Sequence, residues 1–179
     1  IFVSFKKIIK LFSILLWGGF MPNEKNSIGK KVAIIMGSQS DKPVMNAACE
    51  VLDFFNIGYE VLVSSAHRMP NKTRQFALSA EGNGFEIIIA GAGKAAHLPG
   101  VIASYTTLPV IGVPIKSDDL HGIDSLLSIV QMPPGVPVAS VAINGAKNAA
   151  LLAVQILSLK YDNLKIKFKE YKLKLESEA

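Results

Sequence analysis

The chain has a single cysteine, Cys49, among its 179 residues. One thiol cannot form a disulfide within the chain, and it cannot supply the clustered thiolates of a structural zinc site. A lone cysteine is also typical of proteins from a reducing compartment. We therefore expect a cytoplasmic protein without internal disulfides, and we exclude zinc sites that are built on thiolates.

The sequence also lacks a hydrophobic run long enough to cross a bilayer. Its most apolar stretch, residues 11–20, is broken by Ser13 and two glycines, whereas a membrane-spanning helix needs about 20 apolar residues. Half of the residues are nevertheless hydrophobic, and the mean hydropathy is +0.35. This composition can bury a core, so it excludes a disordered chain and predicts a globular protein without a membrane partner.

Charged residues are few, at 18%, and the excess of lysine lies at the two ends. Residues 1–31 carry six lysines against one acid, and residues 160–179 carry six lysines against four acids. Between them, residues 32–159 hold seven basic and nine acidic side chains. A nucleic-acid binder needs a basic patch across a folded face. We therefore expect no nucleic-acid partner.

The N-terminal segment, residues 1–20, combines lysines with an apolar run. These features are shared with a signal peptide, but no small-residue cleavage site follows before Pro22. We interpret this segment as an extension outside the functional protein, followed by a catalytic domain over residues 21–160.

The C-terminal segment, residues 161–179, has apolar residues at helical spacing with lysines between them. This pattern predicts an amphipathic helix that packs on a neighbouring element or subunit. A helix lying on a membrane surface is the alternative. The apolar positions are Leu164, Phe168, Tyr171 and Leu175.

Between the ends, short β-branched runs alternate with helical patterns, the clearest of which are residues 44–55 and 146–159. Strands that are apolar on both faces, each followed by a helix, indicate a parallel sheet covered on both sides. We predict an α/β fold with three layers, a doubly wound, flavodoxin-like parallel sheet of about five strands. The predicted strands are residues 31–36, 59–63, 85–90, 109–113 and 137–143.

Ligands bind beyond the carboxyl ends of the strands in such sheets, so the loops there are the candidate site. The first loop contains Gly37, Ser38, Ser40 and Asp41 before a helix, an arrangement that suits a phosphate. A simple helix cap by Ser40 or Asp41 is the alternative. The loop is neither a P-loop nor a G-x-G-x-x-G motif, so nucleoside triphosphate and dinucleotide binding lack support.

The second loop places His67 beside Arg68, a proton-transfer group next to a bidentate anion clamp. The third loop, residues 91–100, begins with small residues that let the backbone approach a flat ligand. Ser125 has no G-x-S-x-G context, which disfavours a serine hydrolase. The acids at 118–119 with a nearby histidine are typical of a solvated loop, so we expect no metal site.

Five motifs in order then identify a resemblance. They are Gly-Ser-x-Ser-Asp, Ser-Ala-His-Arg-x-Pro, Gly-Ala-Gly-x-Ala-Ala-His-Leu-Pro-Gly, Asp-Ser-Leu-Leu-Ser-Ile-Val-Gln-Met-Pro and Asn-Ala-Ala-Leu-Leu-Ala. Together, over residues 31–159, they closely resemble the bacterial PurE family, the 5-(carboxyamino)imidazole ribonucleotide mutases of de novo purine biosynthesis.

The resemblance implies a mutase that moves a carboxylate from the exocyclic nitrogen to ring carbon 4 without metal, ATP or organic cofactor. It implies a small-molecule ribonucleotide substrate and a homo-octamer around a four-fold axis. His67 would be the general acid/base, since an imidazole with a pKa of about 6.5 both gives and takes protons at neutral pH. The other implied contacts are the 5′-phosphate on Ser38, Ser40 and Arg68, the ribose hydroxyls on Asp41, and Ser65 close to the substrate.

Three departures distinguish this chain from the pattern. Lys42 and Pro43 replace a tryptophan, Lys94 stands where the family normally has glycine, and the stretch 142–148 is two residues shorter. We expect the Lys94 amine to turn aside to solvent or to an acid, so that the pocket stays usable and Lys94→Gly leaves activity similar or higher.

Three other functions remain open at this point. A carboxylase that fixes carbon dioxide directly onto aminoimidazole ribonucleotide is the nearest, although such proteins typically carry lysine in place of Arg68. A non-catalytic nucleotide- or flavin-binding module and an inactive copy are the others.

Overall fold

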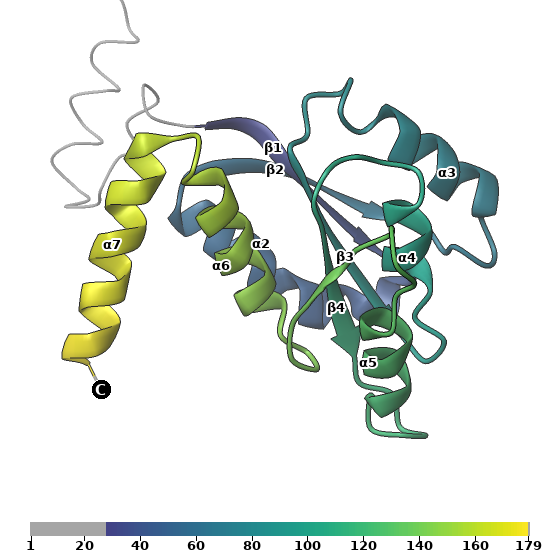
Figure 1. Cartoon of the computed structure of the whole chain (residues 1–179). Helices are drawn as coiled ribbons and strands as arrows, with labels where there is room; N and C mark the ends of the chain where they lie inside the picture. Colours follow the sequence, from purple (N-terminus) through teal and green to yellow (C-terminus); the bar gives the residue numbers. More distant parts are fainter. Residues whose placement is uncertain (1–27, 179) are drawn as a thin grey trace, which may run out of the picture.

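The computed structural model describes residues 28–178 (Figure 1). The interpretation of residues 1–20 as an extension lies outside this range, and the division into domains stays a prediction. The strands are β1 (Ile28–Met36), β2 (Ile57–Val63), β3 (Ile87–Gly93), β4 (Val110–Ile115) and β5 (Ala139–Ser140). The helices are the 3-10 helix η2 (Gln39–Asp41), α2 (Lys42–Phe54), α3 (Pro70–Ser79), α4 (Leu98–Ala103), α5 (Ile123–Val130), α6 (Ala146–Leu157) and α7 (Asp162–Ser177).

The five strands form one parallel sheet in the order β2-β1-β3-β4-β5. The chain moves outward from β1 to β2 and then returns past β1 to β3, so the winding direction reverses between β1 and β3. This confirms the predicted α/β, doubly wound, flavodoxin-like sheet. In such a fold the reversal creates a crevice at the carboxyl ends of β1 and β3.

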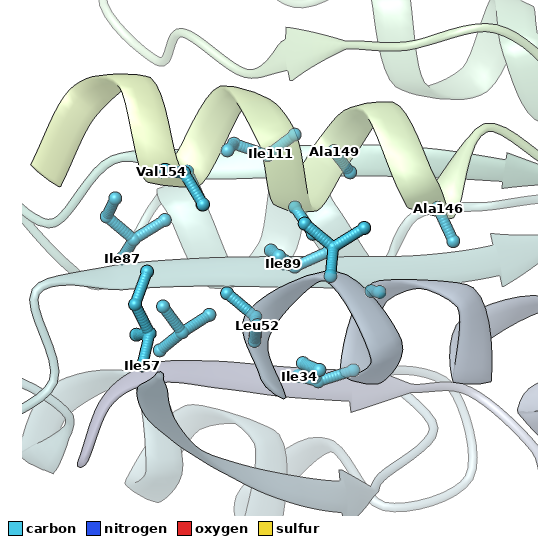
Figure 2. Packing of buried hydrophobic residues seen from close by; sticks show 14 of the residues in the cluster. Ile34, Leu52, Ile57, Ile87, Ile89, Ile111, Ala146, Ala149 and Val154 are labelled. Atoms are coloured by element: carbon cyan, nitrogen blue, oxygen red, sulfur yellow. The ribbon is translucent and has the colours of Figure 1, made fainter. Parts of the chain in front are cut away.

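Alternation along the buried strands sends side chains into two cores. Ile34 and Ile89 are paired in register and face the layer of α2 and α6, whereas Ala33 and Ile35 face the layer of α3, α4 and α5 (Figure 1). Figure 2 shows the first core, in which isoleucines of four strands meet Leu52 of α2. Because both sides of the sheet are covered, its strands are apolar on both faces.

Helix α6 lies close to α2 because its inward face is made of small residues. Ala146, Ala149, Ala150 and Ala153 are fully buried and leave room for the larger side chains of α2 (Figure 2). Alanine is also the best helix former, so the same residues favour the helix and the close packing.

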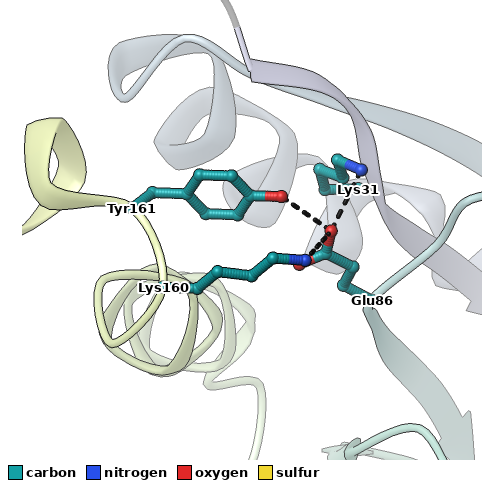
Figure 3. Close-up of polar contacts among 4 residues, drawn as sticks. All are labelled: Lys31, Glu86, Lys160 and Tyr161. Atoms are coloured by element: carbon teal, nitrogen blue, oxygen red, sulfur yellow. Dashed lines mark hydrogen bonds and ion pairs between the residues drawn. The ribbon is translucent and has the colours of Figure 1, made fainter.

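Helix α7 packs on its own domain, beside α6 at the outer side of the molecule (Figure 1). Leu164 is buried, and Phe168 and Tyr171 pack against Phe55 at the end of α2. Leu175, the fourth position predicted for this face, remains 43% exposed. The helical turn before α7 is also tied to the sheet, because Lys160 and Tyr161 contact Glu86 (Figure 3).

The fifth strand is much shorter than the predicted range of residues 137–143. It consists of two residues, and one further backbone bond runs from the Val141 N–H to the Gly112 carbonyl, at 3.3 Å. Pro137 has no N–H to donate, and the chain turns away where the Gly145 N–H bonds to the Ala142 carbonyl. Proline and this turn confine the strand to the middle of the predicted segment.

Among the described residues, none of the helices combines the length and the apolar character that crossing a bilayer requires.

Candidate active site

A cavity of about 440 Å³ opens at the carboxyl edge of the sheet, where the loops after β1, β2, β3 and β4 meet. The reversal between β1 and β3 lies at its centre, which is where ligands bind in sheets of this kind. All six residues singled out from the sequence line this cavity: Ser38, Ser40, Asp41, Ser65, His67 and Arg68. Their roles toward a substrate stay predictions.

The serine loop after β1 is held by a reciprocal cap. The Ser38 hydroxyl accepts a hydrogen bond from the Ser40 N–H at 3.3 Å, and the Ser38 N–H donates to Asp41 Oδ2 at 2.9 Å. The two serine hydroxyls are 2.9 Å apart, with Ser40 donating to Ser38. The cap of η2 is therefore Ser38 and not Ser40, and Asp41 completes the capping box but makes no side-chain cap bond to α2. The same bonds bring two hydroxyls together at the pocket wall.

Asp41 is only 8% exposed, so its carboxyl group is shaped by its surroundings. Burial raises the pKa of Asp41, while the hydrogen bond from the Ser38 N–H and the nearby charge of Arg68 act in the opposite direction. A carboxylate held in this way by the loop is a fixed acceptor, the kind of group that binds hydroxyls.

Arg68 joins the second loop to the first. Its guanidinium Nη2 donates to the Gly37 carbonyl at 3.3 Å, and its backbone N–H donates to the Ser65 hydroxyl at 3.3 Å. The Gly37 N–H in turn donates to the Gly91 carbonyl of β3 at 3.2 Å. The exposed Arg68 lines the same cavity as Ser38 and Ser40, an arrangement suited to an anion.

His67 forms a hydrogen bond with a second histidine, His97. Nε2 of His67 lies 2.8 Å from Nδ1 of His97, and the rings meet edge to face with their centroids 4.9 Å apart. His97 does not itself line the cavity, and the sequence reasoning gave it no role. The available signal was that His97 also follows a strand, as His67 does, which places both histidines at the same edge of the sheet.

The wall formed by β3 requires small residues. A Cβ atom added to Gly91 would lie 2.4 Å from the sulfur of Met45, and one added to Gly93 would lie 3.2 Å from the Ile115 carbonyl oxygen. The backbone of β3 therefore approaches its neighbours more closely than larger residues allow. This agrees with the small-residue wall predicted from the sequence.

Lys94 follows this wall and turns away toward an acid. Its ammonium lies 2.7 Å from Asp119 Oδ2, and the two side chains are 71% and 64% exposed. The hydrogen bond and the charge of Asp119 raise the pKa of Lys94. The prediction that the amine reaches solvent or an acid is confirmed, and the cavity beside it stays open.

The loop after β4 also lines the cavity, through Lys116 and Ser117, which the sequence reasoning did not single out. The Lys116 N–H donates to the side-chain oxygen of Asn144 at 2.9 Å. Asn144 lies in the stretch that is shorter than the family pattern and adopts a positive φ of 59°. The shortened stretch thus supports the pocket from outside.

The described residues show neither the nucleophile of a serine hydrolase at Ser125 nor a group of metal ligands. The buried Ser125 hydroxyl contacts the carbonyls of Ile115 and Gly122, so it bonds to backbone as a structural group. No three histidine, cysteine or acidic side chains among residues 28–178 are grouped to hold a metal ion.

Comparisons with protein families, known proteins and solved structures all find relatives of one kind. A family model described as AIR carboxylase matches residues 31–178. An N5-carboxyaminoimidazole ribonucleotide mutase of Pyrococcus abyssi is 63% identical over 142 residues, 79% of this chain and 82% of that protein. The phosphoribosylaminoimidazole carboxylase of Saccharomyces cerevisiae is 56% identical over 148 residues, which are 83% of this chain but 26% of that longer protein. The crystal structure of Treponema denticola PurE matches with a TM-score of 0.77 and 29% identity, covering 83% of this chain and 93% of that one. The chain therefore belongs to the AIR carboxylase family.

Proposed function

We propose that this protein is a mutase of purine biosynthesis that converts 5-(carboxyamino)imidazole ribonucleotide to 4-carboxy-5-aminoimidazole ribonucleotide. The observation that carries the proposal is the meeting of His67 with Ser38, Ser40 and Arg68 around one cavity. A proton-transfer group next to an anion site is what this reaction needs. The identity of 63% to a mutase over most of both chains adds support.

The reaction needs one proton to move from carbon to nitrogen. When the nitrogen–carboxyl bond breaks, carbon dioxide forms and the exocyclic nitrogen takes a proton from His67. Ring carbon 4 then attacks the carbon dioxide, and its own proton returns to His67, so that no proton is gained or lost. A single imidazole serves both steps, because its cationic form donates a proton and its neutral form accepts one.

His97 would hold His67 in place for both transfers. In a neutral pair of imidazoles one ring donates its N–H and the other accepts. The 2.8 Å bond therefore fixes the orientation of the His67 ring. The carbon dioxide must also stay near the ring, and the wall that includes Ala92, Gly93 and Ala95 closes this side of the cavity.

The phosphate would bind at Ser38, Ser40 and Arg68. Ser38, Ser40 and Arg68 all line the cavity, and charge-assisted bonds to phosphate are the strong ones. Asp41, fixed by its own loop, would accept from the ribose hydroxyls, and Ser65 lies on the same side.

The deciding experiment is a steady-state assay with the carboxyamino substrate, run beside one with aminoimidazole ribonucleotide and bicarbonate. A mutase consumes the first substrate rapidly without added bicarbonate. Faster product formation from the second pair would instead identify a direct carboxylase, the activity in the name of the much longer yeast protein. A yellow protein as purified would identify a flavin-binding module, and turnover of neither substrate would identify an inactive copy.

Assembly into an octamer, as the family resemblance implies, is part of this proposal. Helix α5 leaves Ile123, Leu127 and Val130 about half exposed at helical spacing, and Leu120 is exposed just before it. An apolar stripe of this kind is the usual signature of a contact between subunits. Light scattering at micromolar concentration measures the assembly, and cell fractionation tests the proposed cytoplasmic location.

A further inference from the structure

Lys94 adopts a backbone conformation that favours glycine. Its φ of 54° is in the left-handed region, where a side chain crowds the backbone. Gly93 and Ala95 on either side are small, so Lys94 is the one long side chain on this part of the pocket wall. Strain of this kind persists where the surrounding structure or the function makes use of it. The side chain of Lys94 therefore calls for a functional explanation.

The ion pair with Asp119 does not by itself explain Lys94. Both side chains are mostly exposed, and water and salt screen the attraction between exposed charges. Within residues 28–178 this is the one ion pair that Lys94 forms. An anion that enters the cavity can therefore take the ammonium from Asp119 at little cost.

The cavity offers positive charge at two places. Arg68 lines the cavity together with the serines of the loops after β1 and β2, while Lys94 and Lys116 follow β3 and β4. The proposed substrate also carries two anionic groups, a phosphate and a carboxylate. If the phosphate binds at Arg68, the carboxylate is left for the second place.

Building on the proposed function, we propose that Lys94 selects carboxylated ribonucleotides. In the free protein Asp119 holds the ammonium at the rim of the cavity. When substrate binds, the ammonium leaves Asp119 and pairs with the substrate carboxylate. Lys94 is thus a specificity-determining residue, and Asp119 is its resting partner.

This role predicts a particular kinetic signature. The carboxylate is fully charged in the bound substrate but loses charge as it becomes carbon dioxide. A cation paired with it therefore stabilises the bound substrate more than the transition state, and its removal raises KM without lowering kcat. The expectation from the sequence that Lys94→Gly leaves activity similar or higher therefore applies to kcat and not to KM.

The test compares the KM of the carboxyamino substrate with the inhibition constant of aminoimidazole ribonucleotide, which lacks the carboxylate. Lys94→Met removes the charge and keeps the length of the side chain. We expect KM to rise about fivefold to tenfold and the inhibition constant to stay within about twofold. Asp119→Asn frees Lys94, so KM should fall, by at most about fivefold.

Lys94→Gly removes the charge and also relieves the backbone strain. It should likewise raise KM and leave the inhibition constant unchanged, which separates loss of charge from poor folding. Lys165→Met on α7, far along the chain from the cavity loops, is the control for net charge and should change neither constant. A parallel rise of both constants, an unchanged KM or a kcat lowered by orders of magnitude overturns the role of Lys94. A wild-type protein that does not convert the substrate overturns the proposed function instead.

Discussion

Replacing Glu86 by glutamine should destabilise the protein, because one carboxylate oxygen ties three segments together. Oε1 of Glu86 lies 3.0 Å from the ammonium groups of Lys31 and Lys160, and the Tyr161 hydroxyl donates to it at 2.7 Å (Figure 3). Lys31 belongs to β1, and the other two partners lie between α6 and α7. Glutamine keeps the size of the side chain but loses the charge.

The magnitude follows from the ionisation of Glu86. Burial disfavours its charged form, but hydrogen bonds from Tyr161, Lys31 and Lys160 outweigh that effect and lower the pKa from 4.5 to about 2. Since one pKa unit corresponds to about 1.4 kcal/mol, the full shift corresponds to about 3 kcal/mol. Lys160 is 65% exposed and is screened by water, so we expect a loss of about 2 kcal/mol at pH 7.

The sign of the pH dependence is fixed by the direction of the shift. A carboxyl group whose pKa is lowered in the folded state contributes stability above its unfolded pKa and loses it as pH falls toward its folded pKa. The contribution of Glu86 is therefore complete above about pH 5 and falls by about half by pH 3. The Gln variant lacks this part of the pH dependence.

Urea denaturation of both proteins at pH 7, 5, 4 and 3 measures the effect. The matched control is Glu176→Gln on the exposed side of α7, which should change the free energy of unfolding by less than about 0.5 kcal/mol. The reasoning fails if Glu86→Gln costs no more than this control, or if its cost is the same at pH 3 as at pH 7.

Three further predictions concern the site and the core. His67→Asn should abolish turnover and keep substrate affinity within about tenfold, measured by calorimetry, and a largely active variant would contradict the acid/base role. Arg68→Ala should weaken binding of the ribonucleotide but hardly that of its dephosphorylated nucleoside, and equal losses would refute phosphate binding there. Gly112→Ala should cost about 1–3 kcal/mol in urea denaturation, because the new Cβ would lie 2.4 Å from Cγ2 of the buried Ile129. Gly29→Ala, which meets nothing within 4 Å, is its control, and equal effects would contradict the packing argument.

The arrangement of the sheet was predictable because its strands are buried on both faces. Residues such as Ile87, Ile88 and Ile89 form a run with no polar position, as expected for a strand of a parallel sheet that is covered on both faces. The edge strand β5 was predicted too long, since pairing at an edge depends on backbone donors rather than on apolar composition. The missing donor of Pro137 can be read from the sequence. The turn that ends the strand cannot, because it depends on tertiary contacts.

Site residues were predictable from the sequence only where a single loop combines a position after a strand with a suitable side chain. Ser38 and Arg68 follow strands and have side chains suited to anions, so fold and chemistry point to them together. The bond between His67 and His97 joins residues thirty positions apart, and its geometry depends on how two loops pack. No local pattern encodes that distance, which is why His97 was overlooked.

Two departures from the family pattern, Lys94 and the shortened stretch 142–148, both contact the loop after β4. Their contacts help to decide whether the chain is an inactive copy. Lys94 pairs with Asp119, and Asn144 accepts a hydrogen bond from the Lys116 N–H, so both act on the loop after β4. Both residues adopt positive φ, and asparagine tolerates that conformation better than most residues. A site decaying without selection accumulates unpaired polar groups and blocked cavities. Here Lys94 and Asn144 both have a partner, and the cavity that Lys94 lines remains open, which favours an adapted site over a degenerate one.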